Sequence, residues 1–187
     1  MSARVTRRAV LYGFWCVLLV ACTKDENRGD TAKATLDAAT GIAPQRVEVI
    51  DVGGLKQLVT QRNGKILFLN FWATWCQPCV EEFPEIVRLA SEMPDTEIEF
   101  VAVSLDYPDE VESKILPFIR EKKVPFKVLV ADAKDQDTFI NAVSPRWNGA
   151  LPLTIIYDVE GQQRSFLVGQ GSYEIFKKEI LKTQRTS

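Results

Sequence analysis

One segment in the first half of the chain reads Ile66-Leu67-Phe68-Leu69-Asn70-Phe71-Trp72-Ala73-Thr74-Trp75-Cys76-Gln77-Pro78-Cys79. Its first seven residues form an apolar run that only Asn70 interrupts, which is typical of a strand buried on both faces. From Cys76 to Met93 the apolar residues recur every three or four positions, which predicts a helix. The segment therefore indicates a buried strand that leads directly into a helix, with two cysteines at the junction.

The spacing of Cys76 and Cys79 suits thiol-disulfide chemistry. At the start of a helix several N–H groups lack partners and the helix dipole is positive, so a thiolate on Cys76 is stabilised and its pKa is lowered. Attack on a disulfide requires such a thiolate. Cys79 lies about one helical turn further on and can close a disulfide with Cys76 to release the product. We predict Cys76 as the nucleophile and Cys79 as the resolving cysteine.

Cys76 and Cys79 could have two other roles, as zinc ligands or as inert buried residues. Cys-x-x-Cys is often half of a zinc site, but zinc usually takes four ligands, and the chain has no second such pair and no histidine. Only carboxylates could complete the site. Two inert buried cysteines are the second alternative, which the position between strand and helix disfavours.

Outward from this segment, residues 46–183 alternate between strand and helix patterns, which predicts an α/β domain built on βαβ units. The expected strands span residues 47–52, 66–72, 98–105, 126–131, 153–157 and 164–168. The expected helices span residues 55–61, 76–93, 111–122, 137–143 and 173–182. Pro117 should bend the third of these helices.

The N-terminus has the layout of a secretory signal peptide. Three arginines precede an uncharged run from Ala9 to Ala21, whereas a transmembrane anchor needs about 20 apolar residues. We therefore predict that residues 1–21 form a cleaved signal peptide. Its removal takes away basic residues only and makes the net charge more negative than −2. An acidic mature protein is a poor candidate for nucleic-acid binding.

The apolar run ends in Leu19-Val20-Ala21-Cys22, which resembles the lipobox of bacterial lipoproteins, in which the cysteine is acylated. The following residues hold few large apolar side chains and cannot offset the cost of ordering. We expect residues 22–45 to form a flexible tether with a lipidated Cys22, and residues 46–184 to form a domain outside the cytoplasm on a bacterial membrane. Cys76 and Cys79 are then the only cysteine pair left for disulfide chemistry.

The segment of residues 68–84 resembles the active-site segment of the TlpA/ResA-like family of extracytoplasmic thioredoxin-fold thiol-disulfide oxidoreductases. Residues 101–106 resemble that family's strand after the active-site helix, and residues 149–154 resemble its cis-proline loop. The likeness covers roughly residues 46–183. It implies a single α/β domain with a thioredoxin-like fold, in which helices flank a central mixed β-sheet.

The resemblance also implies where a substrate binds. Pro152 would be cis and face the Cys76 sulfur, and the backbone of Leu151 would pair with an extended substrate segment. Trp75 would cover the disulfide as an exposed platform. A trans proline that begins a strand, and a tryptophan packed in the core, are the ordinary alternatives.

Glu82 corresponds to a glutamate of the same family and lies three residues after Cys79, on the same face of the helix. Thioredoxin carries a buried aspartate where this chain has Asn70, a neutral side chain that cannot accept a proton. The resemblance thus favours Glu82 as the acid-base group for Cys79. A solvated helix carboxylate is the alternative.

As to function, the resemblance implies a protein disulfide reductase without cofactor or metal. The Gln77-Pro78 dipeptide lacks the histidine of strongly oxidising relatives, which favours a reductant. Its expected partners are disulfides of exported proteins, with apocytochrome c as a candidate, and a membrane electron donor of the thioredoxin-reducing type. We expect a monomer.

Two rival functions share the fold. A peroxiredoxin would carry threonine or serine three residues before the reactive cysteine, where this chain has Ala73. A copper-delivery module would add a histidine ligand and usually spaces its cysteines four apart. The sequence favours neither rival.

Overall fold

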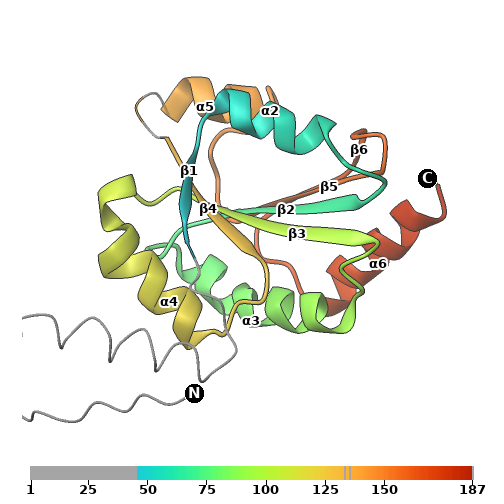
Figure 1. Ribbon diagram of the computed structural model, residues 1–187, viewed down its shortest axis with the longest axis horizontal. Coiled ribbons are helices and arrows are strands. Elements are labelled where there is room, and N and C mark those ends of the chain that lie inside the picture. The colour runs from blue at the N-terminus through green and yellow to red at the C-terminus, as the bar shows by residue number, and fades with distance from the viewer. Residues whose placement is uncertain (1–45, 133, 135, 187) are drawn as a thin grey trace, which may run out of the picture. The chain divides into compact units, whose positions relative to one another are not determined.

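Six strands form one mixed sheet in the computed structural model, which describes residues 46–132, 134 and 136–186. They are β1 (Glu48–Ile50), β2 (Ile66–Trp72), β3 (Ile98–Ser104), β4 (Lys127–Ala131), β5 (Leu153–Tyr157) and β6 (Gln163–Val168). Across the sheet the order is β1-β4-β3-β2-β5-β6 (Figure 1). The first four strands in this order are parallel, whereas β5 and β6 run antiparallel to their neighbours. The predicted single α/β domain with a mixed sheet is confirmed.

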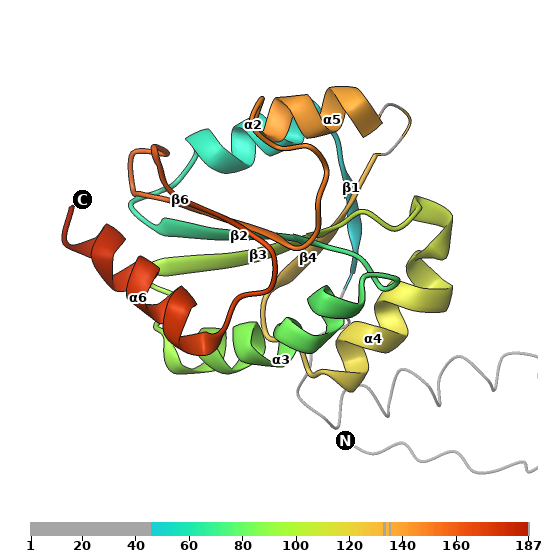
Figure 2. The ribbon, with the colours of Figure 1, turned by 180° about the vertical axis from the view of Figure 1, so that it is seen from behind.

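Helices cover both faces of this sheet. They are α2 (Val52–Thr60), α3 (Gln77–Glu92), α4 (Leu116–Glu121), α5 (Gln136–Val143) and α6 (Tyr173–Gln184). Helices α2 and α5 lie on one face, and α3, α4 and α6 lie on the other (Figures 1 and 2). Strand β2 is central and all of its residues are buried, which explains its apolar run.

The alternation of side chains along β2 decides which residues face α3. Successive side chains of a strand point to opposite faces. Leu69 and Phe71 pack in the core under α2 and α5, whereas Phe68 and Trp72 pack in the cores on the α3 side. Asn70 lies between Phe68 and Trp72 in this alternation and therefore faces α3.

Some boundaries differ from the predicted ones for local reasons. Helix α2 begins earlier than residue 55 because the Asp51 carboxylate caps it, accepting a hydrogen bond from the Gly54 N–H at 2.7 Å. The helix expected over residues 111–122 is divided. A 3₁₀ turn and a π-helical turn, Val111–Ile115, precede α4, and Pro117 lies in the first turn of α4. Proline is tolerated there because the first N–H groups of a helix have no intrahelical acceptor.

The predicted signal peptide, the lipidated Cys22 and the tether of residues 22–45 lie outside the described residues, and they stay predictions. In the part of the chain that the structure describes, no helix combines the length and the apolar character needed to span a membrane.

Candidate active site

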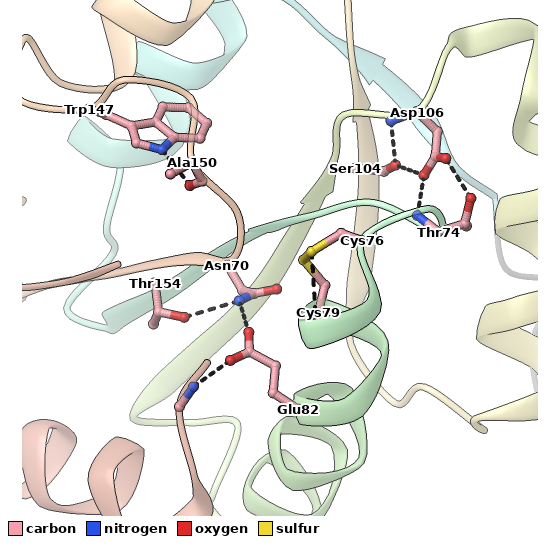
Figure 3. Close-up of a disulfide and its surroundings, with 11 residues drawn as sticks. Asn70, Thr74, Cys76, Cys79, Glu82, Ser104, Asp106, Trp147, Ala150 and Thr154 are labelled. Atoms are coloured by element: carbon pink, nitrogen blue, oxygen red, sulfur yellow. Dashed lines mark hydrogen bonds between the residues drawn. A yellow bond between two sulfur atoms is a disulfide. The ribbon is translucent and has the colours of Figure 1, made fainter. Parts of the chain in front are cut away.

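Cys76 and Cys79 are joined by a disulfide at the junction of β2 and α3, with their Cα atoms 5.2 Å apart (Figure 3). Cys76 is the N-cap of α3, and its Sγ accepts a hydrogen bond from the Cys79 N–H at 3.3 Å. This N–H is one of the groups that a helix start leaves without an intrahelical acceptor. After reduction, a thiolate on Cys76 would lie where the helix dipole and this N–H stabilise it.

The surroundings of the two sulfurs differ in access to solvent. Cys79 is fully buried and Cys76 is 6% exposed, whereas the neighbouring Trp75 is 65% exposed. An incoming substrate sulfur therefore meets Cys76 before Cys79. The predicted exposure of Trp75 is confirmed, and its role in substrate binding remains a proposal.

A buried carboxylate holds the loop that leads to Cys76. Asp106 accepts hydrogen bonds from the Thr74 N–H at 2.9 Å, the Thr74 hydroxyl at 2.6 Å and the Ser104 hydroxyl at 2.5 Å. Strands β2 and β3 are parallel with Trp72 opposite Ser104, so Thr74 and Asp106 leave the same edge of the sheet together. Sequence reasoning gave Asp106 no role, although it stands in the segment of residues 101–106 that resembles the family.

The predicted cis peptide bond between Leu151 and Pro152 is confirmed. Leu151 packs against the hydrophobic cluster that contains both cysteines. The hydrogen-bond ladder of β5 begins at Leu153, so the backbone of Leu151 lies outside the ladder. Trp147, which sequence reasoning missed, braces the loop because its indole N–H donates to the Ala150 carbonyl at 2.8 Å.

Glu82 is a buried carboxyl group one helical turn after Cys79, with only 1% of its surface exposed. Its Oε1 accepts from Asn70 Nδ2 at 3.0 Å, and its Oε2 accepts from the Gly171 N–H at 2.7 Å. Burial raises the pKa of Glu82 from 4.5 to about 7, although the hydrogen bonds from Gly171 and Asn70 lower it in part. The alternative of a solvated helix carboxylate is wrong.

Residues far apart in the chain complete the surroundings of Glu82. Asn70 Nδ2 also donates to the Thr154 hydroxyl at 3.0 Å. Gly171 precedes α6, and a Cβ at this position would lie 2.2 Å from the Phe176 ring. Thr154 could have been noticed in the segment of residues 149–154, whereas no local signal marks Gly171.

Comparison with known proteins identifies the class of this site. The pattern described as the AhpC/TSA family matches residues 43–165 of the chain. The chain belongs to this family. Among its relatives, the thiol-disulfide oxidoreductase ResA of Geobacillus thermodenitrificans is 29% identical over 146 residues, covering 78% of each chain. ResA of Bacillus subtilis is 34% identical over 121 residues, covering 64% of this chain and 62% of the relative.

A solved structure of the thioredoxin family agrees with the fold. The thiol:disulfide interchange protein of Chlorobium tepidum superposes with a TM-score of 0.56 at 21% identity, covering 66% of this chain and 82% of that one. Together with the disulfide between Cys76 and Cys79, the relatives assign this member of the AhpC/TSA family to the thiol-disulfide oxidoreductases of the ResA type. The predicted resemblance is confirmed.

Proposed function

We propose that the protein is a membrane-tethered reductant of disulfides in exported proteins. The observation that carries the proposal is the disulfide between Cys76 and Cys79 at the N-terminus of α3, with the buried Glu82 one turn away. In the reduced protein, the Cys76 thiolate attacks a substrate disulfide. The substrate S–S bond breaks, one substrate sulfur leaves and takes a proton, and a mixed disulfide with Cys76 remains.

The second step needs a deprotonated Cys79. Its buried thiol has to lose a proton before the sulfur attacks Cys76 Sγ, forms the Cys76–Cys79 bond and releases the second substrate thiol. Burial disfavours a thiolate, so a base is required. Glu82 fits this role because its pKa of about 7 lies near neutral pH, where a general acid-base group is most effective. Two electrons pass to the substrate in the whole cycle.

The groups around the exposed side of Cys76 would bind the substrate. The backbone of Leu151 lies outside the β5 ladder, which supports the proposal that it pairs with an extended substrate segment, with Pro152 and Trp75 beside that segment. Disulfides of exported proteins, among them the haem-binding cysteines of apocytochrome c, are the substrates that this proposal favours. Cys22 would carry the lipid anchor, and a membrane donor of the thioredoxin-reducing type would reduce the disulfide again.

The proposal is tested by the redox equilibrium of the full chain with glutathione and by its reduction of insulin disulfides. We expect a potential near that of thioredoxin, about −270 mV, rather than about −120 mV as in strong oxidants. Cys76→Ser should abolish insulin reduction, and Cys22→Ser, which removes a cysteine outside the couple, should not. A potential in the range of the strong oxidants would overturn the assignment as a reductant.

A further inference from the structure

Within the part of the chain that the structure describes, two buried side-chain polar atoms have no hydrogen-bond partner: Asn70 Oδ1 and Trp72 Nε1. The oxygen of Asn70 is the more informative of the two, because the nitrogen of the same amide, Asn70 Nδ2, donates hydrogen bonds to both Glu82 and Thr154. Leaving a buried acceptor unpaired is costly, and such an atom in a native structure calls for an explanation.

The partners of Asn70 determine which end of its amide is the oxygen. An ionised carboxylate only accepts hydrogen bonds, so the amide nitrogen has to face Glu82, and the oxygen has to point elsewhere. Asn70 faces α3 from between Phe68 and Trp72, and Trp72 shares a hydrophobic cluster with Cys79. Figure 3 shows the amide oxygen on the side of the disulfide and the nitrogen on the side of Glu82 and Thr154.

The disulfide form offers this oxygen no hydrogen from Cys79, because a disulfide sulfur carries none. Reduction places a proton on Cys79, and the resulting S–H group is a weak donor. Asn70 is 1% exposed and Cys79 is fully buried. A buried acceptor that is unpaired in the oxidised form therefore matches a buried donor that exists only after reduction.

We propose that Asn70 Oδ1 accepts a hydrogen bond from the Cys79 thiol in the reduced and mixed-disulfide forms, while Asn70 Nδ2 keeps Glu82 in place. The amide is thus a positioning residue for the resolving cysteine, and it carries no proton itself. When Glu82 takes the proton and Cys79 attacks Cys76 Sγ, the hydrogen bond is lost again. The inference deepens the proposed function, since it rests on the same Cys76–Cys79 couple.

The first test is the redox equilibrium with glutathione of the full chain carrying Asn70→Leu. It is measured at about pH 8.5, where Glu82, with its pKa of about 7, is largely ionised and can only accept the hydrogen bond from Asn70 Nδ2. In the variant, the reduced form loses the proposed hydrogen bond from the Cys79 thiol to Asn70 Oδ1. The oxidised form no longer contains this unpaired buried oxygen. We expect a shift of about tenfold toward the disulfide, which corresponds to a potential about 30 mV more negative.

Thr154→Val is the matched control, because it removes the other acceptor of Asn70 Nδ2 and leaves Oδ1 untouched. Its equilibrium should stay within about twofold of the wild type, since the Thr154 bond is present in both redox forms. An unshifted Asn70→Leu equilibrium, or equal shifts in the two variants, would overturn the proposal. A wild-type potential in the oxidising range would contradict the reductant assignment alone, because this test compares variants with one another.

A second measurement observes the Cys79 thiol directly. The infrared difference between the full chain carrying Cys76→Ser and the chain carrying both Cys76→Ser and Cys79→Ser isolates the S–H stretch of Cys79. We expect this band at the lower frequency of a hydrogen-bonded thiol, and at higher frequency when Asn70→Leu is added to Cys76→Ser. A free-thiol band in the presence of Asn70 would contradict the inference.

Discussion

Cys76 and Glu82 lie on the same helix in opposite electrostatic surroundings. Cys76 Sγ is at the N-terminal end, where the dipole and the Cys79 N–H favour an anion. Glu82 is buried further along α3, where desolvation favours its neutral form. One group is thus predisposed to lose its proton and the other to bind one near neutral pH, which is the division that the two steps of disulfide exchange require.

The alkylation rates of the reduced protein test this division for the cysteines. At neutral pH, iodoacetamide should modify Cys76 at least about tenfold faster than Cys79, since each unit of pKa changes the thiolate fraction about tenfold. Burial of Cys79 adds to the difference. Mass spectrometry of the two modified positions over time provides the rates, and equal rates would contradict the assignment of nucleophile and resolving cysteine.

Glu82→Gln separates the two steps of the reaction. The first attack by Cys76 should be nearly unchanged, whereas release of the mixed disulfide should slow by about 10²-fold or more, as is typical of lost acid-base assistance. The defect should shrink as pH rises, because Cys79 then ionises without help. Stopped-flow measurement of both steps between about pH 6 and 10 gives the answer. A release rate that Glu82→Gln leaves unchanged across this range would exclude the role.

At the scale of elements, the site depends on three segments that meet around Glu82. Strand β2 supplies Asn70, helix α3 supplies Glu82, and the connection between β6 and α6 supplies the Gly171 N–H. The connection that holds Gly171 carries neither cysteine, so a shift of this connection changes the hydrogen bonds of the carboxyl group without moving the cysteines.

This arrangement explains what could be predicted from the sequence and what could not. The β2–α3 junction has a local pattern of apolar spacing and cysteine placement, so the sequence alone was enough to predict it. The cis bond before Pro152 and the proposed role of Glu82 were predicted from the family resemblance. Gly171 is distant from Glu82 in the sequence, so no local pattern predicts their hydrogen bond. The unpaired oxygen of Asn70 depends on how the side chains of Asn70, Glu82 and Thr154 are oriented, which the spacing of apolar residues does not determine.

Gly171→Ala tests the contribution of the β6–α6 connection. The added methyl group would meet the Phe176 ring, so the connection has to move and its N–H leaves Glu82 Oε2. We expect a loss of about 1–3 kcal/mol in stability from overpacking. Because the Gly171 hydrogen bond lowers the pKa of Glu82, the pH profile of mixed-disulfide release should shift to higher pH.

The matched rescue is the double variant Gly171→Ala with Phe176→Leu, which makes room for the methyl group. It should bring the pH profile of release back toward that of the wild type, even though the smaller side chain reduces packing in the core. A wild-type profile in Gly171→Ala alone would show that this hydrogen bond does not set the acidity of Glu82.

At the scale of the whole molecule, the proposed tether decides where the chemistry takes place. Cys22→Ser should abolish labelling of the protein by radioactive fatty acid in bacterial cells, because the acylated sulfur is gone, and should leave insulin reduction by the purified protein unchanged. Cys16→Ser is the control, since it changes a cysteine inside the predicted signal peptide. Unlabelled wild-type protein that still fractionates with membranes would indicate an uncleaved anchor instead.

The ionisation of Glu82 should make the free energy of unfolding of the domain depend on pH. Its pKa of about 7 in the folded protein is above the ordinary 4.5, so between these values the folded state binds more protons than the unfolded chain. The free energy of unfolding should therefore fall as pH rises from about 5 to 8, by about 3 kcal/mol over the full titration. The chain has no histidine that would titrate in this window, and burial raises the pKa of Tyr157 to about 12, well outside it.

Urea unfolding of the oxidised protein at several pH values, followed by tryptophan fluorescence, measures this dependence. Glu82→Gln should flatten the slope between about pH 5 and 8, because an amide does not titrate. The amide nitrogen would also face the N–H donor of Asn70 or of Gly171, which lowers stability equally at every pH, so the slope and not the absolute value is the readout. The contrary result is a parallel loss of stability in the wild type and Glu82→Gln over this range. It would show that the buried carboxyl group does not ionise near pH 7, and it would contradict the proposal that Glu82 is the base for Cys79.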